Sequence, residues 1–169
     1  MTMSENSRRP RLDDKSDLPT DAPEFAAPGT NVFERRVYRL QEYTGDGVTI
    51  VAFVPAGSIR KARFLAWLTL TNGIDALVVS NYRPSAPERA EMATEVRVPV
   101  LADADGSIAR TYGFDYSRTA GGRILLIDST NRIRQVWTGQ IDPTDVHRAA
   151  KRHLDRSVEL ILDSATDDR

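Results

Sequence analysis

Residues 49–67 read TIVAFVPAGSIRKARFLAW and contain the pattern that decides the fold. Residues 48–54 are almost all β-branched or apolar, which is typical of a strand covered on both faces. Pro55 ends this strand, and Ser58 is a suitable N-cap for a helix that we expect to reach about Thr71. The stretch therefore predicts a strand, a tight turn and a helix in direct succession.

The segments on either side continue the alternation of buried strands and helices. A helix between two strands demands a right-handed crossover that leaves the strands parallel, whereas the closing hairpin adds antiparallel strands. The sequence therefore predicts an α/β fold with a mixed central sheet and helices on both faces. In the first helix, Trp67 falls on the apolar face and is expected to be buried. The predicted strands cover residues 37–43, 48–54, 74–80, 98–101, 123–128 and 132–138, and the predicted helices cover 58–71, 85–96, 105–112 and 142–164.

Length and composition favour a single domain. With 169 residues and 40% hydrophobic content, the chain can bury one sizeable core. We expect a disordered tail over the polar residues 1–20, a domain over 21–164 and a frayed end at 165–169. The net charge of −1 gives no general attraction to nucleic acid or membrane, so neither is expected as a partner. No apolar run approaches the roughly 18 residues of a membrane span, and we expect a cytoplasmic protein.

The chain contains no cysteine, which excludes disulfides, thiolate metal sites and thiol catalysis together. Its two histidines, His147 and His153, lie six residues apart on the last predicted helix, outside the spacing of a helical metal pair. We therefore expect neither a metal ion nor another cofactor.

Four segments stand out by their order and spacing. They are LPTDAPEF (18–25), VTIVAFVPAGS (48–58), VPVLADADGSIARTYGF (98–114) and RILLIDSTNRI (123–133). Together they resemble the peroxiredoxin branch of the thioredoxin-like superfamily, the alkyl hydroperoxide reductase and thiol-specific antioxidant group. The third segment, in which an Asp-x-Asp-Gly turn leads into a helix ending in Tyr-Gly, is the most specific. The resemblance implies a thioredoxin-like fold and, for the family, an antioxidant oxidoreductase activity.

The active-site loop that this resemblance implies lacks its nucleophile. In the family the loop has the form Pro-x-x-x-Thr/Ser-x-x-Cys, and Pro55 matches its proline. Strict counting places Ala62 at the cysteine, whereas a shift of one residue gives Ser58 the hydroxyl role and Lys61 the thiol position. Aligned with a thioredoxin Cys-x-x-Cys, Ser58 and Lys61 take the two cysteine positions. Peroxidase chemistry is therefore not supported, and no catalytic residue is predicted.

Positive charge near the same turn suggests a different site. The family carries an arginine that polarises the peroxide, and Arg123 is the matching residue, although it lies one residue closer to the end of its strand than usual. The resemblance implies that Arg123 faces the turn that carries Ser58, Arg60 and Lys61. These four residues form a candidate pocket for a carboxylate, phosphate or sulfate group. The alternative is that Arg60 and Lys61 point to solvent or pair with acidic residues.

Three hypotheses for the function follow. The first is a redox-inactive peroxiredoxin-like domain that acts by binding a protein partner or by forming a homodimer. The second is an oxidoreductase of this family whose catalytic cysteine has been lost or replaced. The third is a protein that binds an anion or small ligand at the turn near Ser58.

Overall fold

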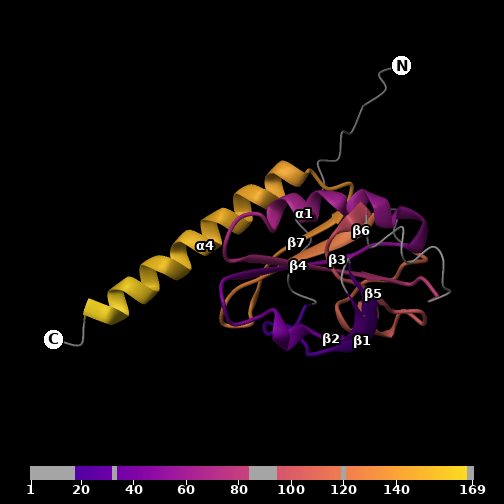
Figure 1. Ribbon diagram of the computed structural model, residues 1–169, viewed down its shortest axis with the longest axis horizontal. Coiled ribbons are helices and arrows are strands. Elements are labelled where there is room, and N and C mark those ends of the chain that lie inside the picture. Colours follow the sequence, from indigo (N-terminus) through magenta and orange to yellow (C-terminus); the bar gives the residue numbers. More distant parts are fainter. Residues whose placement is uncertain (1–17, 32–33, 84–94, 119–120, 167–169) are drawn as a thin grey trace, which may run out of the picture.

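The computed structural model describes residues 18–31, 34–83, 95–118 and 121–166, with side chains as far as residue 156. A central sheet lies between two layers that contain the helices (Figure 1). The predicted helix at 85–96 lies almost wholly outside the described residues. The strands are β1 (Ala26–Thr30), β2 (Arg35–Arg39), β3 (Val48–Phe53), β4 (Ile74–Ser80), β5 (Val100–Ala102), β6 (Gly122–Ile127) and β7 (Ile133–Gly139). The helices are the 3-10 helices η2 (Leu40–Glu42) and η3 (Ala56–Arg63) and the α-helices α1 (Phe64–Leu68), α3 (Ser107–Thr111) and α4 (Pro143–Thr166).

The sheet has the order β2-β1-β5-β4-β3-β6-β7 and is mixed, as predicted. β3 pairs in parallel with β4 and antiparallel with β6, and each residue of β3 is buried. This central position explains the continuous apolar run in the sequence, because a strand covered on both faces has no solvent side. β6 and β7 form the predicted hairpin.

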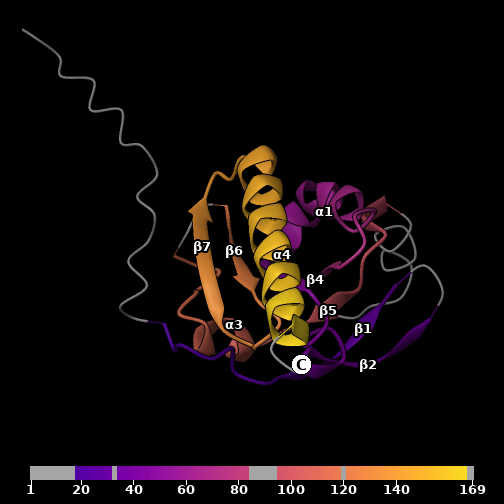
Figure 2. The same ribbon diagram turned by 90° about the vertical axis from the view of Figure 1, so that its left-hand side faces the viewer.

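Helices cover both faces of the sheet, which confirms the predicted α/β architecture. α1 and the first part of α4 lie over one face (Figure 2), and α3 and η2 pack against the other. Alternate residues of β3 divide between the two layers, as the period of a strand requires. The first layer buries Ile50, Ala52, Leu65, Leu68, Val146 and Ala149, and the second buries Val51, Phe53, Leu40, Ala109 and Tyr112.

The single helix predicted from Ser58 to Thr71 is wrong in its details. The segment forms the 3-10 helix η3, followed by the short helix α1, and Pro55 rather than Ser58 occupies the N-cap position. The Ser58 amide donates to the Pro55 carbonyl at 2.8 Å, a bond that spans three residues instead of four. Gly57 lowers the helix propensity of this turn. The basic residues Arg60, Lys61 and Arg63 fall in the last turn of η3, where positive charge agrees with the helix dipole, so charge does not explain the tighter helix.

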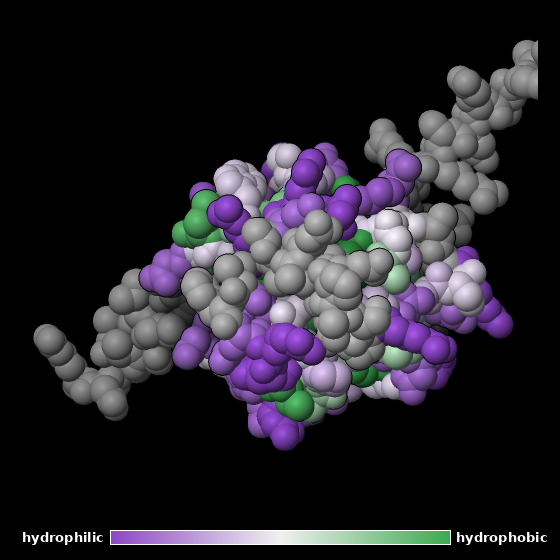
Figure 3. Space-filling model, turned by 45° about the vertical axis from the view of Figure 1, so that its right-hand side comes forward, coloured by the Kyte–Doolittle hydropathy of each residue, from purple (hydrophilic) through white to green (hydrophobic). Residues whose placement is uncertain are grey.

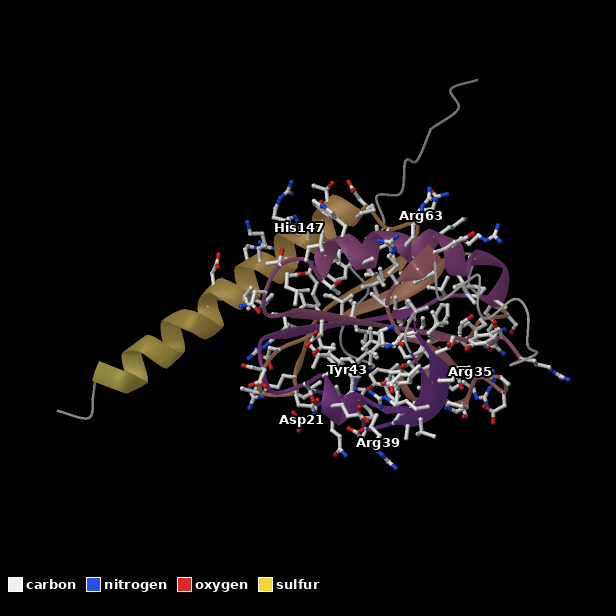
Figure 4. All side chains as sticks on the ribbon, viewed as in Figure 1. Asp21, Arg35, Arg39, Tyr43, Arg63 and His147 are labelled. Carbon is white, nitrogen blue, oxygen red and sulfur yellow. The ribbon has the colours of Figure 1, made fainter. Side chains whose placement is uncertain are left out.

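Trp67 is a second correction. The residue is 57% exposed, and its ring lies against the His147 ring of α4 with 4.7 Å between the ring centroids. Figure 4 shows His147 on α4, on the helical side of the molecule, together with Arg63 of η3. The apolar stripe of α1 buries Leu65 and Leu68 and leaves Trp67 at its margin.

The segment near Thr20 is hydrogen-bonded to β7, whereas the far end of α4 extends away from the sheet. Most of the expected N-terminal tail lies outside the described residues, but the Thr20 carbonyl accepts a hydrogen bond from the Ile133 amide at 3.0 Å. α4 starts at the predicted Pro143 and extends beyond the edge of the sheet (Figure 1). Within the described residues, no helix has both the length and the apolar character needed to cross a bilayer.

Candidate functional site

A pocket of about 330 Å³ lies at the end of β3, on the face of the sheet that carries η3. Its size falls within the range of small-molecule sites in proteins. β3 and η3 supply one side, and the paired ends of β6 and β7 supply the other. The described residues that line it are Ala52, Phe53, Val54, Ser58, Lys61, Ala62, Phe64, Gly121, Gly122, Ile124, Gly139, Gln140 and Ile141.

Ser58 and Lys61 of η3 both line this pocket. Val54, which precedes Pro55, and Ala62, which strict counting places at the family's cysteine, line it as well. Ser58 is half-buried, Lys61 is exposed and Ala62 is 2% exposed. Among the described residues, neither the Ser58 hydroxyl nor the Lys61 ammonium has a hydrogen-bond or ion-pair partner. The structure therefore places a hydroxyl-bearing and a cationic residue together in the pocket lining, and neither side chain bonds to another described residue.

Glycines allow the strands on the opposite side to approach closely. A Cβ on Gly122 would lie 2.7 Å from the Phe53 carbonyl oxygen, and one on Gly121 would lie 2.5 Å from the Gly139 carbonyl oxygen. Real Cβ atoms do not tolerate such distances, so this wall of the pocket consists of bare backbone. Gly122 and Gly139 are partners in the β6–β7 ladder.

Arg60 pairs with an acidic residue, which is the alternative to the anion pocket that the sequence left open. Its Nε lies 3.0 Å from a carboxylate oxygen of Glu95, and its side chain is 69% exposed. Arg60 is absent from the pocket lining, although it is adjacent to Lys61 in the chain.

Arg123 lies on the other face of the sheet. It pairs with Phe53, which belongs to the second core layer, and directly paired residues of antiparallel strands point to the same side. Its Nη1 donates to the Tyr112 carbonyl at 3.0 Å, and its Nε donates to the Thr138 hydroxyl at 3.1 Å. The expected convergence of Arg60, Lys61 and Arg123 on one spot is therefore wrong, and anion binding itself stays a prediction.

The unusual spacing of Arg123 explains why its side chain lies on the face of the sheet opposite to the predicted one. Successive side chains of a strand point to opposite faces, so a displacement by one residue moves a side chain across the sheet. Counting back by one residue reaches Gly122, which lines the pocket and has no side chain. Among the described residues, the pocket lining thus lacks the arginine that the family resemblance implies, and the chain has no cysteine.

Sequence reasoning missed the contribution of Gly139, Gln140 and Ile141 to the pocket. The predicted hairpin did not reveal it, because pairing outward from the turn without a bulge would set Thr138 opposite Gly122, whereas the register shift between Leu126 and Ile127 brings Gly139 there. Gln140 and Ile141 follow the end of β7, where a residue pattern alone does not show which way the chain turns.

The buried Tyr112 and the half-buried Tyr116, both on the second face, have structural roles. The Tyr112 hydroxyl donates to the Pro23 carbonyl, and burial raises the pKa of Tyr112 well above its usual value. The Tyr116 hydroxyl donates to Asp103 at 3.3 Å, and burial together with that carboxylate raises the pKa of Tyr116. Asp103 also accepts the Ile108 and Ala109 amides at the start of α3. Both hydroxyls stay protonated and hold loops in place.

Comparison with solved structures gives a consistent result. A reduced 2-Cys peroxiredoxin from Plasmodium vivax superposes with a TM-score of 0.64 at 14% identity, covering 80% of this chain and 94% of that one. The chain has the thioredoxin-like fold of peroxiredoxins. The mitochondrial 2-Cys peroxiredoxin of Plasmodium falciparum gives a TM-score of 0.64 at 17% identity, with coverage of 83% and 96%. Peroxidoxin BcpB from Mycobacterium tuberculosis gives 0.61 at 20% identity, with coverage of 80% and 97%.

The TM-scores relate the fold of the chain to that of peroxiredoxins, and the low sequence identities assign no activity to it. No protein-family model matches the sequence, and comparison with curated proteins gives no match. The function must therefore be argued from the pocket.

Proposed function

We propose that this protein is a redox-inactive, thioredoxin-like domain that acts by binding a small ligand in the pocket between Ser58, Lys61 and Gly122. One observation carries the proposal. At the place where a thiol and an arginine would act in a peroxiredoxin, the chain has an open pocket lined by Ser58, Lys61, Ala62 and Gly122. None of these residues can pass through a sulfenic acid or a disulfide.

The described residues on one face of the molecule form no broad apolar patch that would favour a protein contact there (Figure 3). Hydrophobic residues are scattered among hydrophilic ones on the face shown in Figure 3, and isolated apolar groups are ordinary on a protein surface. The homodimer or protein partner expected from the sequence stays a prediction, which light scattering would test. The cytoplasmic location also stays a prediction.

The absence of thiol chemistry is tested with the purified protein. Hydrogen peroxide or cumene hydroperoxide should not be consumed at the expense of dithiothreitol or thioredoxin above a metal-free buffer blank. Thiol-dependent turnover would overturn the proposal in favour of the family's oxidoreductase activity.

Ligand binding is tested by NMR of backbone amides with a library of small fragments. At least one fragment should shift the amides of Val54, Ser58, Ile124 and Gly139 together. If every fragment leaves these four amides unchanged, the pocket is not a binding site.

A further inference from the structure

We infer that the pocket takes a small organic monocarboxylate with an apolar body. This inference rests on the proposed function and names the class of its ligand. The charge, the hydroxyl and the apolar walls of the pocket support it separately.

The charge of the pocket indicates a monoanion. Lys61 is the charged residue among the described lining residues, and that lining contains no carboxylate. Since Arg60 pairs with Glu95 and Arg123 lies on the other face of the sheet, the part of the chain that the structure describes supplies no second cation to the pocket. One ammonium matches the charge of one carboxylate, whereas a phosphate dianion would retain excess negative charge.

The hydroxyl adds a donor beside this cation. Ser58 and Lys61 lie three residues apart on η3, a 3-10 helix in which side chains at that spacing lie one above the other. A carboxylate has two oxygens and can accept from both groups at once. The pairing would satisfy two polar groups that have no partner among the described residues.

The base of the pocket is apolar. Val54, Ala62 and Ile124 are 8%, 2% and 4% exposed, and they line it beside the half-buried Phe64 and Ile141. Lys61 is exposed, so the charge lies toward solvent while the hydrocarbon surface lies inward. This polarity fits a ligand whose carboxylate stays at the mouth and whose hydrocarbon part contacts the base.

The test compares three probes on the full chain by calorimetry and amide NMR. Hexanoate carries both the charge and the chain, hexanamide keeps the chain without the charge, and acetate keeps the charge with almost no chain. Hexanoate should bind more tightly than either, with amide shifts at Val54, Ser58 and Ile124.

Variants then locate the interaction. Lys61→Gln should weaken hexanoate about five- to tenfold, as expected for a charged hydrogen bond near the surface, and should leave hexanamide unchanged. Ser58→Ala should weaken hexanoate by a smaller factor. Arg60→Gln is the matched control, because it removes the neighbouring cation, which pairs with Glu95 outside the pocket, and should change neither probe.

The outcomes separate this inference from the proposed function. If hexanamide binds as tightly as hexanoate, or if Lys61→Gln and Arg60→Gln weaken hexanoate equally, the monocarboxylate is overturned while a ligand pocket remains. If acetate binds as tightly as hexanoate, the apolar body is overturned. If hexanoate shifts no pocket amide but other fragments do, the inference fails alone.

Discussion

Single residues decide which chemical groups the pocket presents. Ser58, Lys61 and Ala62 stand where the resemblance places a thiol, and a one-residue displacement turns Arg123 away from them. Each change is small in sequence, but a strand converts a shift of one position into a change of face. The Arg123 guanidinium instead links β6, β7 and the end of α3, because it donates hydrogen bonds to the Thr138 hydroxyl and the Tyr112 carbonyl.

Asp128 is the residue whose titration should affect stability. It is 7% exposed, and its carboxylate accepts from the Thr130 amide and hydroxyl, the Arg132 amide and Arg134 Nε in the β6–β7 turn. Burial acts to raise the pKa of Asp128, but the hydrogen bonds from Thr130 and Arg134 outweigh it, and the pKa lies below its usual value. A depressed folded-state pKa means that this stabilisation is complete above the usual pKa and is lost as pH falls through the lowered one.

We therefore expect Asp128→Asn to destabilise the protein by about 1–3 kcal/mol at pH 7. The cost should shrink as pH falls below about 4, where the unfolded parent binds a proton at this carboxyl before the folded parent does. Urea unfolding at both pH values measures the difference, with Asp155→Asn, at an exposed position on α4, as the control. An equal cost at pH 7 and at pH 3 would assign the effect to packing instead of charge.

At the scale of elements, the pocket depends on close contacts between strand ends. Gly121 has φ of +92°, and a Cβ there would also meet the Gly139 carbonyl oxygen at 2.5 Å. Gly121→Ala should therefore destabilise the fold by about 2 kcal/mol or more. Gly57→Ala is the matched control, since Gly57 has no positive φ and no atom within 4 Å of the added carbon, and it should be neutral or slightly stabilising. Thermal unfolding of both variants compares them, and equal melting temperatures would show that the β6–β7 wall can relax.

Most strands of the sheet could be predicted from the sequence. The apolar runs located β3, β4 and β6, because burial on both faces needs continuous β-branched and aliphatic residues. The edge strand β7 was located instead by the turn that joins it to β6. The η3 segment could not be predicted, since apolar periodicity is nearly the same for bonds that span three or four residues. The direction of Arg123 depends on its pairing with Phe53, which is fixed by tertiary contacts outside the strand itself.

At the scale of the whole molecule, the sheet separates Ser58 from the Arg123 guanidinium. The pocket with Ser58 lies on the face covered by α1 and α4, whereas the Arg123 guanidinium lies on the face covered by α3. Introducing a thiol should therefore give a reactive side chain without peroxidase catalysis, because no arginine side chain among the described pocket residues can polarise a peroxide there.

Two cysteine variants test this separation. Ser58→Cys places a thiol at a half-buried position in the pocket, and Ala62→Cys places one where the side chain is 2% exposed. A disulfide reagent such as DTNB should label the first about tenfold or more faster than the second, because thiol reactivity requires access. The parent, which has no cysteine, gives the background of the labelling assay.

The peroxidase activity of the same two variants is a separate measurement. Neither variant should consume hydrogen peroxide with dithiothreitol faster than a free thiol at the same concentration. If Ser58→Cys alone turned over peroxide efficiently, the missing cysteine would be the whole difference, and the position of Arg123 would not matter for the chemistry.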